Sequence, residues 1–121
     1  MTRPIALLAI LVAFFPFGTP LPVSTQDGHG PRRIEIVARR FTFEPASITL
    51  KKGEPVVLVL KTSDVPHSVR FRDLNLEVKA SKNRSGEAQY TPDKDGEFVG
   101  HCGIFCGAGH GSMEMTIHVI G

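Results

Sequence analysis

The stretch CGIFCGAGHGSM, Cys102–Met113, places two thiols, an imidazole and a thioether within one short segment. Three residues separate Cys102 from Cys106, three more precede His110, and two more precede the methionine. Glycines are interleaved between these side chains, and their backbone freedom allows several side chains to converge on one point. The stretch is therefore predicted to be a tight loop that folds around a bound ion.

The side chains of this stretch favour copper as that ion. Thiolate and thioether ligands together select copper, whereas imidazole suits copper and zinc alike. Met113 discriminates between the two metals, because structural zinc sites use Cys, His or carboxylate ligands and no thioether. One more ligand is needed from elsewhere, and His67 in DVPHSVRF is the candidate.

A structural disulfide is the alternative interpretation of the two cysteines, if the chain is exported to an oxidising compartment. A bridge across three residues would remove little entropy from the unfolded chain, because the closed loop is so small. It would also leave His110 and Met113 unexplained. Metal binding is preferred, and a zinc- or disulfide-stabilised binding domain stays open as an alternative.

The order His, Cys, Cys, His, Met resembles the binuclear copper (CuA) domain of cytochrome c oxidase subunit II and the similar domain of nitrous oxide reductase. GEFVGHCGIFCGAGH, residues 96–110, is similar to the family's strand and ligand loop. DVPHS, residues 64–68, is similar to the segment that supplies its first histidine. The resemblance implies a cupredoxin-like Greek-key β-sandwich, in which the ligands sit at one end and most of them lie on the loop between the last two strands.

The resemblance also implies a metal centre of two copper ions held by six residues: His67, Cys102, Ile104, Cys106, His110 and Met113. The two cysteines would bridge both ions, and each histidine would cap one of them. The thioether of Met113 would be a weak axial ligand to one copper, and the backbone carbonyl of Ile104 to the other. The family usually has Glu or Gln at the Ile104 position. A carbonyl does not depend on its side chain, so coordination is expected to survive this departure.

The N-terminal part of the chain is predicted to lie outside this domain. Residues 1–23 have the pattern of a signal peptide, because Arg3 is followed by an apolar run that extends to Phe17. An uncleaved membrane anchor is the alternative, although three prolines disfavour a spanning helix of about 20 residues. Residues 24–33 are rich in Gly, Pro and polar side chains and are interpreted as a linker. The protein is expected to be periplasmic or on the outer face of the cytoplasmic membrane.

Residues 34–121 are predicted to form one all-β domain. Short segments rich in Val, Ile, Phe and Thr alternate with clusters of Pro, Gly, Asp and Lys, which is typical of a β-sandwich. A short turn of helix is expected around Asp73–Ser81, and Val56–Leu60, apolar on both faces, is expected to be an inner strand. The expected strands are Ile34–Ala38, Ser47–Lys51, Pro55–Thr62, Ser68–Phe71, Glu87–Thr91, Gly96–Cys102 and Glu114–Ile120.

Alternation along the strands separates candidate ligands from other side chains of the same type. Met115 shares a face with Met113 and is predicted to fill the core without binding metal. His118 falls on the opposite face and is expected to meet solvent. His101 directly precedes Cys102, so its side chain is expected to turn away from the metal site.

Soft ligands held by a stiff scaffold suit electron transfer. The predicted function is to relay single electrons between redox partners such as cytochrome c and a terminal oxidase or reductase, and a partner is expected to dock where His110 is ringed by Ile104, Phe105 and Ala108. A copper storage or delivery protein for oxidase assembly is the alternative. The chain shows no nucleophile beside a base, no paired carboxylates and no phosphate loop, which favours an electron carrier over an enzyme. If it is part of a complex, it would be cytochrome c oxidase subunit II-like.

A net charge of +2, with the basic residues spread along the chain, does not indicate a nucleic-acid partner. Contact with a membrane is expected only through an uncleaved N-terminal anchor.

Overall fold

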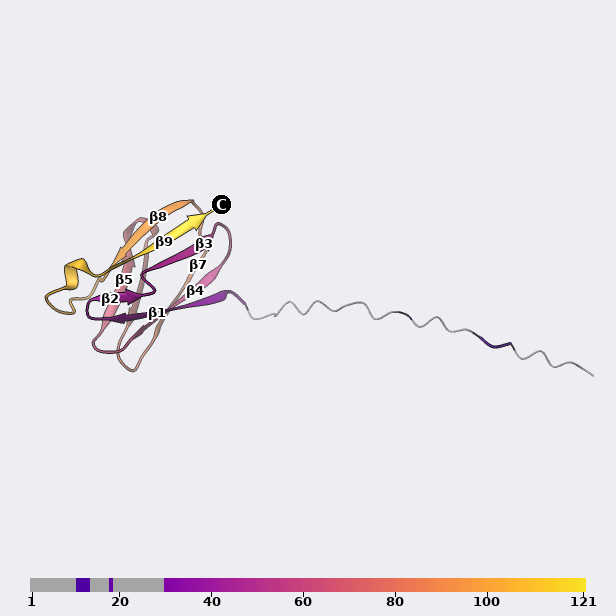
Figure 1. Ribbon diagram of the computed structural model, residues 1–121, viewed down its shortest axis with the longest axis horizontal. Coiled ribbons are helices and arrows are strands. Elements are labelled where there is room, and N and C mark those ends of the chain that lie inside the picture. The colour runs from indigo at the N-terminus through magenta and orange to yellow at the C-terminus, as the bar shows by residue number, and fades with distance from the viewer. Residues whose placement is uncertain (1–10, 14–17, 19–29) are drawn as a thin grey trace, which may run out of the picture.

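The computed structural model describes residues 11–13, 18 and 30–121. Most of the predicted signal peptide and linker lies outside the described residues, although Arg32 and Arg33 of the predicted linker form the start of the first strand. None of the described residues forms a helix with the length and apolar character needed to cross a membrane. The elements, shown in Figure 1, are β1 (Arg32–Arg39), β2 (Thr42–Glu44), β3 (Ser47–Lys51), β4 (Val56–Thr62), β5 (His67–Phe71), η1 (Arg72–Leu74), β6 (Leu76–Ala80), β7 (Gly86–Tyr90), β8 (Gly96–His101), η2 (His110–Ser112) and β9 (Glu114–Ile120).

The strands form two layers of a sandwich (Figure 1). One sheet has the order β2-β1-β4-β7, and the other has the order β3-β9-β8-β5-β6. The pairs β1 with β4 and β3 with β9 are parallel, whereas the remaining neighbours are antiparallel. The predicted all-β sandwich is confirmed.

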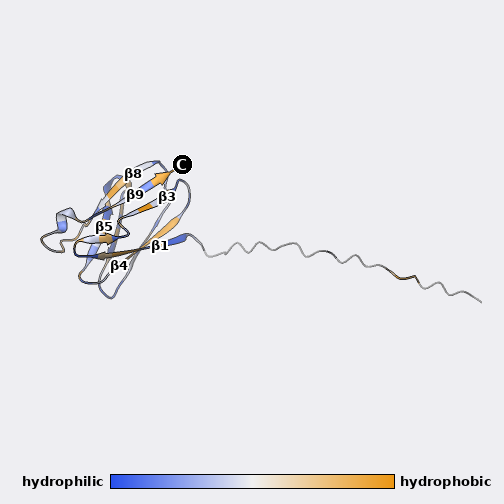
Figure 2. Ribbon diagram, in the orientation of Figure 1, coloured by the Kyte–Doolittle hydropathy of each residue, from blue (hydrophilic) through white to orange (hydrophobic). Residues whose placement is uncertain are grey.

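The core lies between the two sheets, and strand alternation decides which side chains enter it. In β1, Ile36 and Ala38 are buried while their neighbours are more exposed. Positions 56–60 of β4 are buried except for Val57, as expected for an inner strand between β1 and β7. Figure 2 shows the resulting succession of apolar and polar positions along the strands.

Two strands were not expected from the sequence. The short turn of helix expected around Asp73–Ser81 is present as η1 at the start of this segment, but the strand β6 occupies most of the rest. β6 pairs antiparallel with the whole of β5, and this hairpin stabilises an extended backbone in a segment whose Glu, Lys and Ala have low strand preference. β2 is a second unexpected strand of only three residues, paired with the end of β1.

The fold brings one early strand next to one late loop. We call residues 102–113, between β8 and β9, the cysteine loop. The backbone N–H of Cys102 donates to the carbonyl of Met113 over 3.1 Å, which closes the neck of this loop. β5 begins at His67 and pairs with β8 through Arg70 and His101. The first residue of β5 therefore meets the cysteine loop at the end of the sandwich opposite the entry of the chain into β1 (Figure 1).

Candidate metal centre

The two cysteines of the cysteine loop lie side by side and point into the protein. Cys102 and Cys106 are each 5% exposed, and their Sγ atoms are 3.8 Å apart. Both thiols are free, so no disulfide joins them in this structure. The spacing of three residues thus places two soft donors next to each other at a buried point.

Two further donors flank the first thiol. The Sγ of Cys102 is 3.9 Å from Nδ1 of His67 and 3.1 Å from the backbone oxygen of Ile104. His67 is fully buried at the start of β5. The donor atoms of His67 and of the two cysteines all lie within 4.8 Å of one another, close enough to share a metal site.

The second thiol has a matching pair of neighbours. The Sγ of Cys106 is 3.7 Å from Nδ1 of His110 and 3.8 Å from Sδ of Met113. Met113 is fully buried, whereas His110 is half-buried in η2. Each thiol thus has one imidazole nitrogen and one weaker donor beside it. The structure brings together all six residues that the sequence singles out.

The thiol of Cys106 is protonated in the metal-free protein at neutral pH. Burial raises the pKa of the Cys106 thiol to about 11, and the hydrogen bond with Cys102 and the charge of Cys102 add to this effect. A metal ion must therefore displace a proton from Cys106 on binding. The donor set of thiols, imidazoles, thioether and carbonyl nevertheless fits copper better than the other common metals, because its softest members are sulfur atoms.

Asp64 fixes the ring of His67. Its Oδ1 lies 2.7 Å from Nε2 of His67, while its Oδ2 accepts the backbone N–H of Arg40 over 2.7 Å. Burial raises the pKa of Asp64, but hydrogen bonds from the backbone of Arg40 and Val65 and from His67 outweigh this and hold that pKa well below its ordinary value. The carboxylate thus stays ionised and accepts from Nε2. This leaves Nδ1 of His67 as the acceptor that faces Cys102.

Three more residues support the cysteine loop from outside it. Nε of Arg40 donates to the carbonyl of Cys106 over 2.9 Å, and the hydroxyl of Ser68 accepts the N–H of Gly103 over 2.9 Å. The ring of Phe41 lies so close to Gly109 that a Cβ there would be 2.5 Å from it. Sequence reasoning missed these contacts. They join segments far apart in the chain, and no local pattern signals them.

His101, His118 and Met115 lie outside the cluster. Met115 is buried in the core, as predicted. His101 is exposed, with Nδ1 3.8 Å from Glu114, and His118 is partly exposed, with Nδ1 2.9 Å from Glu97. The alternation along β8 and β9 therefore separates these side chains from the candidate ligands in the way the sequence predicts.

The open edge of the centre is apolar. Phe105 is 79% exposed, and its ring centroid lies 5.7 Å from that of His110. Ile104 is half-buried, and Ala108 is exposed. Of the apolar side chains expected around His110, the structure places the ring of Phe105 next to it.

Comparison with known proteins agrees with this geometry. The pattern of the cupredoxin-like domain family matches residues 5–114. Cytochrome c oxidase subunit 2 of Thermus thermophilus is 27% identical over 104 residues, which are 86% of this chain and 77% of that protein. These similarities confirm the predicted resemblance to oxidase subunit II.

Solved structures show the same fold. A chain of a heme-copper terminal oxidase dimer superposes with a TM-score of 0.67 at 29% identity, over 77% of this chain and 67% of the other. The periplasmic domain of subunit II of cytochrome oxidase of Bradyrhizobium japonicum also gives a TM-score of 0.67, over 74% of this chain and 83% of that domain. Its 16% identity makes this second likeness one of fold alone. The predicted cupredoxin-like sandwich is confirmed.

Proposed function

Because the chain belongs to the cupredoxin-like domain family, we propose that it binds two copper ions in a CuA centre and relays single electrons between redox partners. One observation supports this most strongly. The two buried thiols are 3.8 Å apart, and each has its own imidazole nitrogen and its own weaker donor. A blue-copper site for a single ion would use one thiolate, two imidazoles and one weak axial donor, so the second thiol would have no role in it. The second thiol beside the first would let these residues hold two ions.

The proposed ligands are the six clustered residues: His67, Cys102, the carbonyl of Ile104, Cys106, His110 and Met113. When bound, a copper pair supplies a one-electron redox couple. The protein supplies a donor set that is already assembled, because Asp64 orients one imidazole and Ser68 holds the backbone of Gly103. Ligands held in this way rearrange little when an electron arrives or leaves, which favours rapid transfer.

Most side chains of the proposed centre are shielded from water. His67 and Met113 are fully buried, and both thiols are nearly so. The half-buried His110 reaches the surface, beside the exposed ring of Phe105. We propose that electrons enter or leave at this edge, where a redox partner such as cytochrome c or an oxidase or reductase subunit docks.

We further propose that residues 1–23 are a signal peptide, residues 24–33 a linker, and residues 34–121 the copper domain, exported to the outer face of the cytoplasmic membrane. The apolar run up to Phe17 supports export, as does the likeness in fold to a periplasmic domain. Edman sequencing of protein recovered from the periplasm tests this. An N-terminus near residue 24 is expected, and recovery of the uncleaved chain in the membrane fraction would favour the anchor.

Metal content and electron spin resonance test the proposed centre directly. Reduced apoprotein is expected to take up two copper ions and to show one unpaired electron shared by both. Cys102→Ser and Cys106→Ser should each abolish the shared signal, whereas His118→Ala, on the outer face of β9, should leave it unchanged. One copper per chain, or bound zinc, would contradict the proposal. Copper that passes to an oxidase without exchanging electrons with cytochrome c would favour the delivery function.

A further inference from the structure

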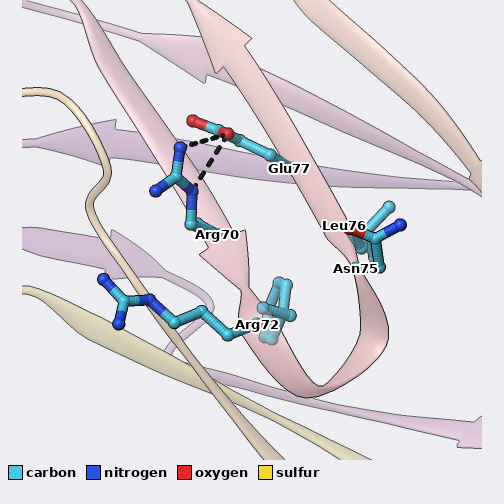
Figure 3. Close-up of a pocket in the computed structure, with 6 residues that line it drawn as sticks. Arg70, Arg72, Asn75, Leu76 and Glu77 are labelled. Atoms are coloured by element: carbon cyan, nitrogen blue, oxygen red, sulfur yellow. Dashed lines mark hydrogen bonds and ion pairs between the residues drawn. The ribbon is translucent and has the colours of Figure 1, made fainter.

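Two groups of cations line hollows beside the cysteine loop, near its apolar residues Ile104 and Phe105. One hollow, next to Cys102 and Gly103, is lined by Arg70, Arg72 and His101. Figure 3 shows the head of Arg70 turned toward Glu77, while Arg72 extends away from that carboxylate. The positive charge of this hollow therefore comes chiefly from Arg72.

A second hollow is lined by Ile104 together with Lys79 and Arg84, both of which are exposed. These two cations come from β6 and from the turn that follows it. The cysteine loop thus has basic side chains in two hollows, one next to Cys102 and Gly103 and one next to Ile104.

The cations at this end are less neutralised than the anions. Within residues 30–121, Arg72, Lys79 and Arg84 have no ion-pair partner. Two of the nearby acids are already engaged, since Glu77 pairs with Arg70 and Asp64 with His67. Asp73, the residue after Arg72, is the acid near these cations that has no ion pair among the described residues. Two further acids, Glu44 and Glu114, face Arg39 and His101 respectively. The end of the sandwich that holds the proposed copper centre therefore has a local excess of positive charge, although the whole chain has a net charge of only +2.

We propose that this surface recognises an electron-transfer protein whose docking face is acidic. The partner's carboxylates would meet Arg72 in one hollow and Lys79 and Arg84 in the other, while its apolar redox edge covers Phe105 and His110. Complementary charge of this kind accelerates association and selects the partner, and it does so less at high ionic strength. The inference rests on the proposed function, because it specifies which class of redox protein exchanges electrons at the edge of His110.

The test uses the copper-loaded full chain and two c-type cytochromes of similar reduction potential, one with an acidic haem-edge face and one with a basic face. Stopped-flow rates of electron exchange are measured at low and at high salt. We expect the acidic cytochrome to react faster at low salt and to lose this advantage as salt is added. A faster reaction with the basic cytochrome, or rates independent of salt for both, would overturn the inference.

Charge-reversal variants locate the effect. Arg72→Glu and Arg84→Glu should each slow exchange with the acidic cytochrome several-fold at low salt. Lys51→Glu is the matched control, because it makes the same charge change on β3 beside Ile120, away from the cysteine loop, and it should behave as the wild type. Equal effects of all three variants would show that only net charge matters and would also overturn the inference.

Two measurements on the same samples keep this proposal separate from the function on which it rests. Copper content and reduction by hydroquinone, a small uncharged molecule, report on the centre itself. If either fails in the wild type, the proposed electron relay is wrong. If both are normal and the cytochromes show no charge preference, the relay stands and the acidic partner is rejected.

Discussion

Two buried methionines two residues apart have different surroundings and so make a matched pair. Sδ of Met113 lies 3.8 Å from Sγ of Cys106, whereas Met115 packs in the core and makes no hydrogen bond with either thiol. Met113→Leu is expected to keep two coppers and raise the reduction potential, because an axial thioether tunes it. Met115→Leu should leave the potential unchanged and cost less than about 1.5 kcal/mol in stability. Redox titration of both proteins checks this, and an equal shift in the two would contradict the ligand assignment.

Arg40 links both halves of the proposed centre. Its side chain donates to the carbonyl of Cys106, and its backbone N–H donates to the carboxylate that orients His67. Arg40→Gln is expected to loosen the loop by about 1 kcal/mol, the net value of one hydrogen bond, and to speed loss of copper to a chelator roughly two- to tenfold. Arg39→Gln is the control, because Arg39 pairs only with Glu44 on the surface. Unchanged copper loss in Arg40→Gln would show that Phe41 and Ser68 suffice.

The candidate ligands follow from the sequence, but the residues around them do not. Cys, His and Met at fixed spacing indicate a metal site, because each of these side chains can bind a metal. Arg40 reaches a carbonyl 66 residues away, and a carbonyl belongs to every residue, so no sequence pattern points to this contact. Asp64, three residues before His67, is the one supporting residue with a local signal.

The packing of the cysteine loop on the β1–β2 turn makes one glycine indispensable. A Cβ at Gly109 would lie 2.5 Å from the ring of Phe41, whereas a Cβ at Gly111 would have nothing within 4 Å. Gly109→Ala is expected to lower the free energy of unfolding by about 1–3 kcal/mol, the usual effect of overpacking, and to weaken copper retention. Gly111→Ala should match the wild type. Urea unfolding of the wild type, Gly109→Ala and Gly111→Ala measures these free energies. A Gly109→Ala variant as stable as the wild type would mean that Phe41 moves aside freely.

Most strands, including the five-residue β3, β5 and β7, are predicted from the sequence, whereas β2 and β6 are not. β9 alternates along its seven residues and β4 has an uninterrupted apolar run, so the patterns of these two strands are unambiguous. β6 also alternates, with Val78 and Ala80 buried, but its short run contains Glu and Lys and resembles a helical turn. Its pairing with β5 makes this segment a strand. Such a pairing cannot be predicted from the sequence of either strand alone.

The stability of the whole reduced apoprotein should fall in both acid and alkali. The pKa of Glu77 is lowered by the hydrogen bond from Arg70, and that of Asp64 is also lowered, so the unfolded chain binds more protons than the folded one. This stability is present above the unfolded value of about 4 and is lost as the pH falls. The pKa of Cys106 is raised, chiefly by burial, so its contribution is lost above the unfolded value of about 8.5.

The urea midpoint should therefore be highest between about pH 5 and 8. Midpoints measured across this range and on either side of it check the prediction. Glu77→Gln should flatten the acid side, and Cys106→Ser should flatten the alkaline side. Copper loading should also flatten the alkaline side, because a bound thiolate no longer titrates. A midpoint that does not change from neutral to strongly acidic solution would contradict the assignment of these carboxyl groups.

The parallel pairing of β3 with β9 determines when the sheet can be completed during synthesis. β3 lies near the start of the domain, yet its hydrogen-bonding partner is the final strand, and His67 precedes Cys102 by 35 residues. During synthesis from the N-terminus, β3 has no partner until the last strand has been made. Such long-range pairings close late and slowly, because the intervening chain must first be ordered. We therefore expect copper to enter the proposed centre only after β9 has been synthesised.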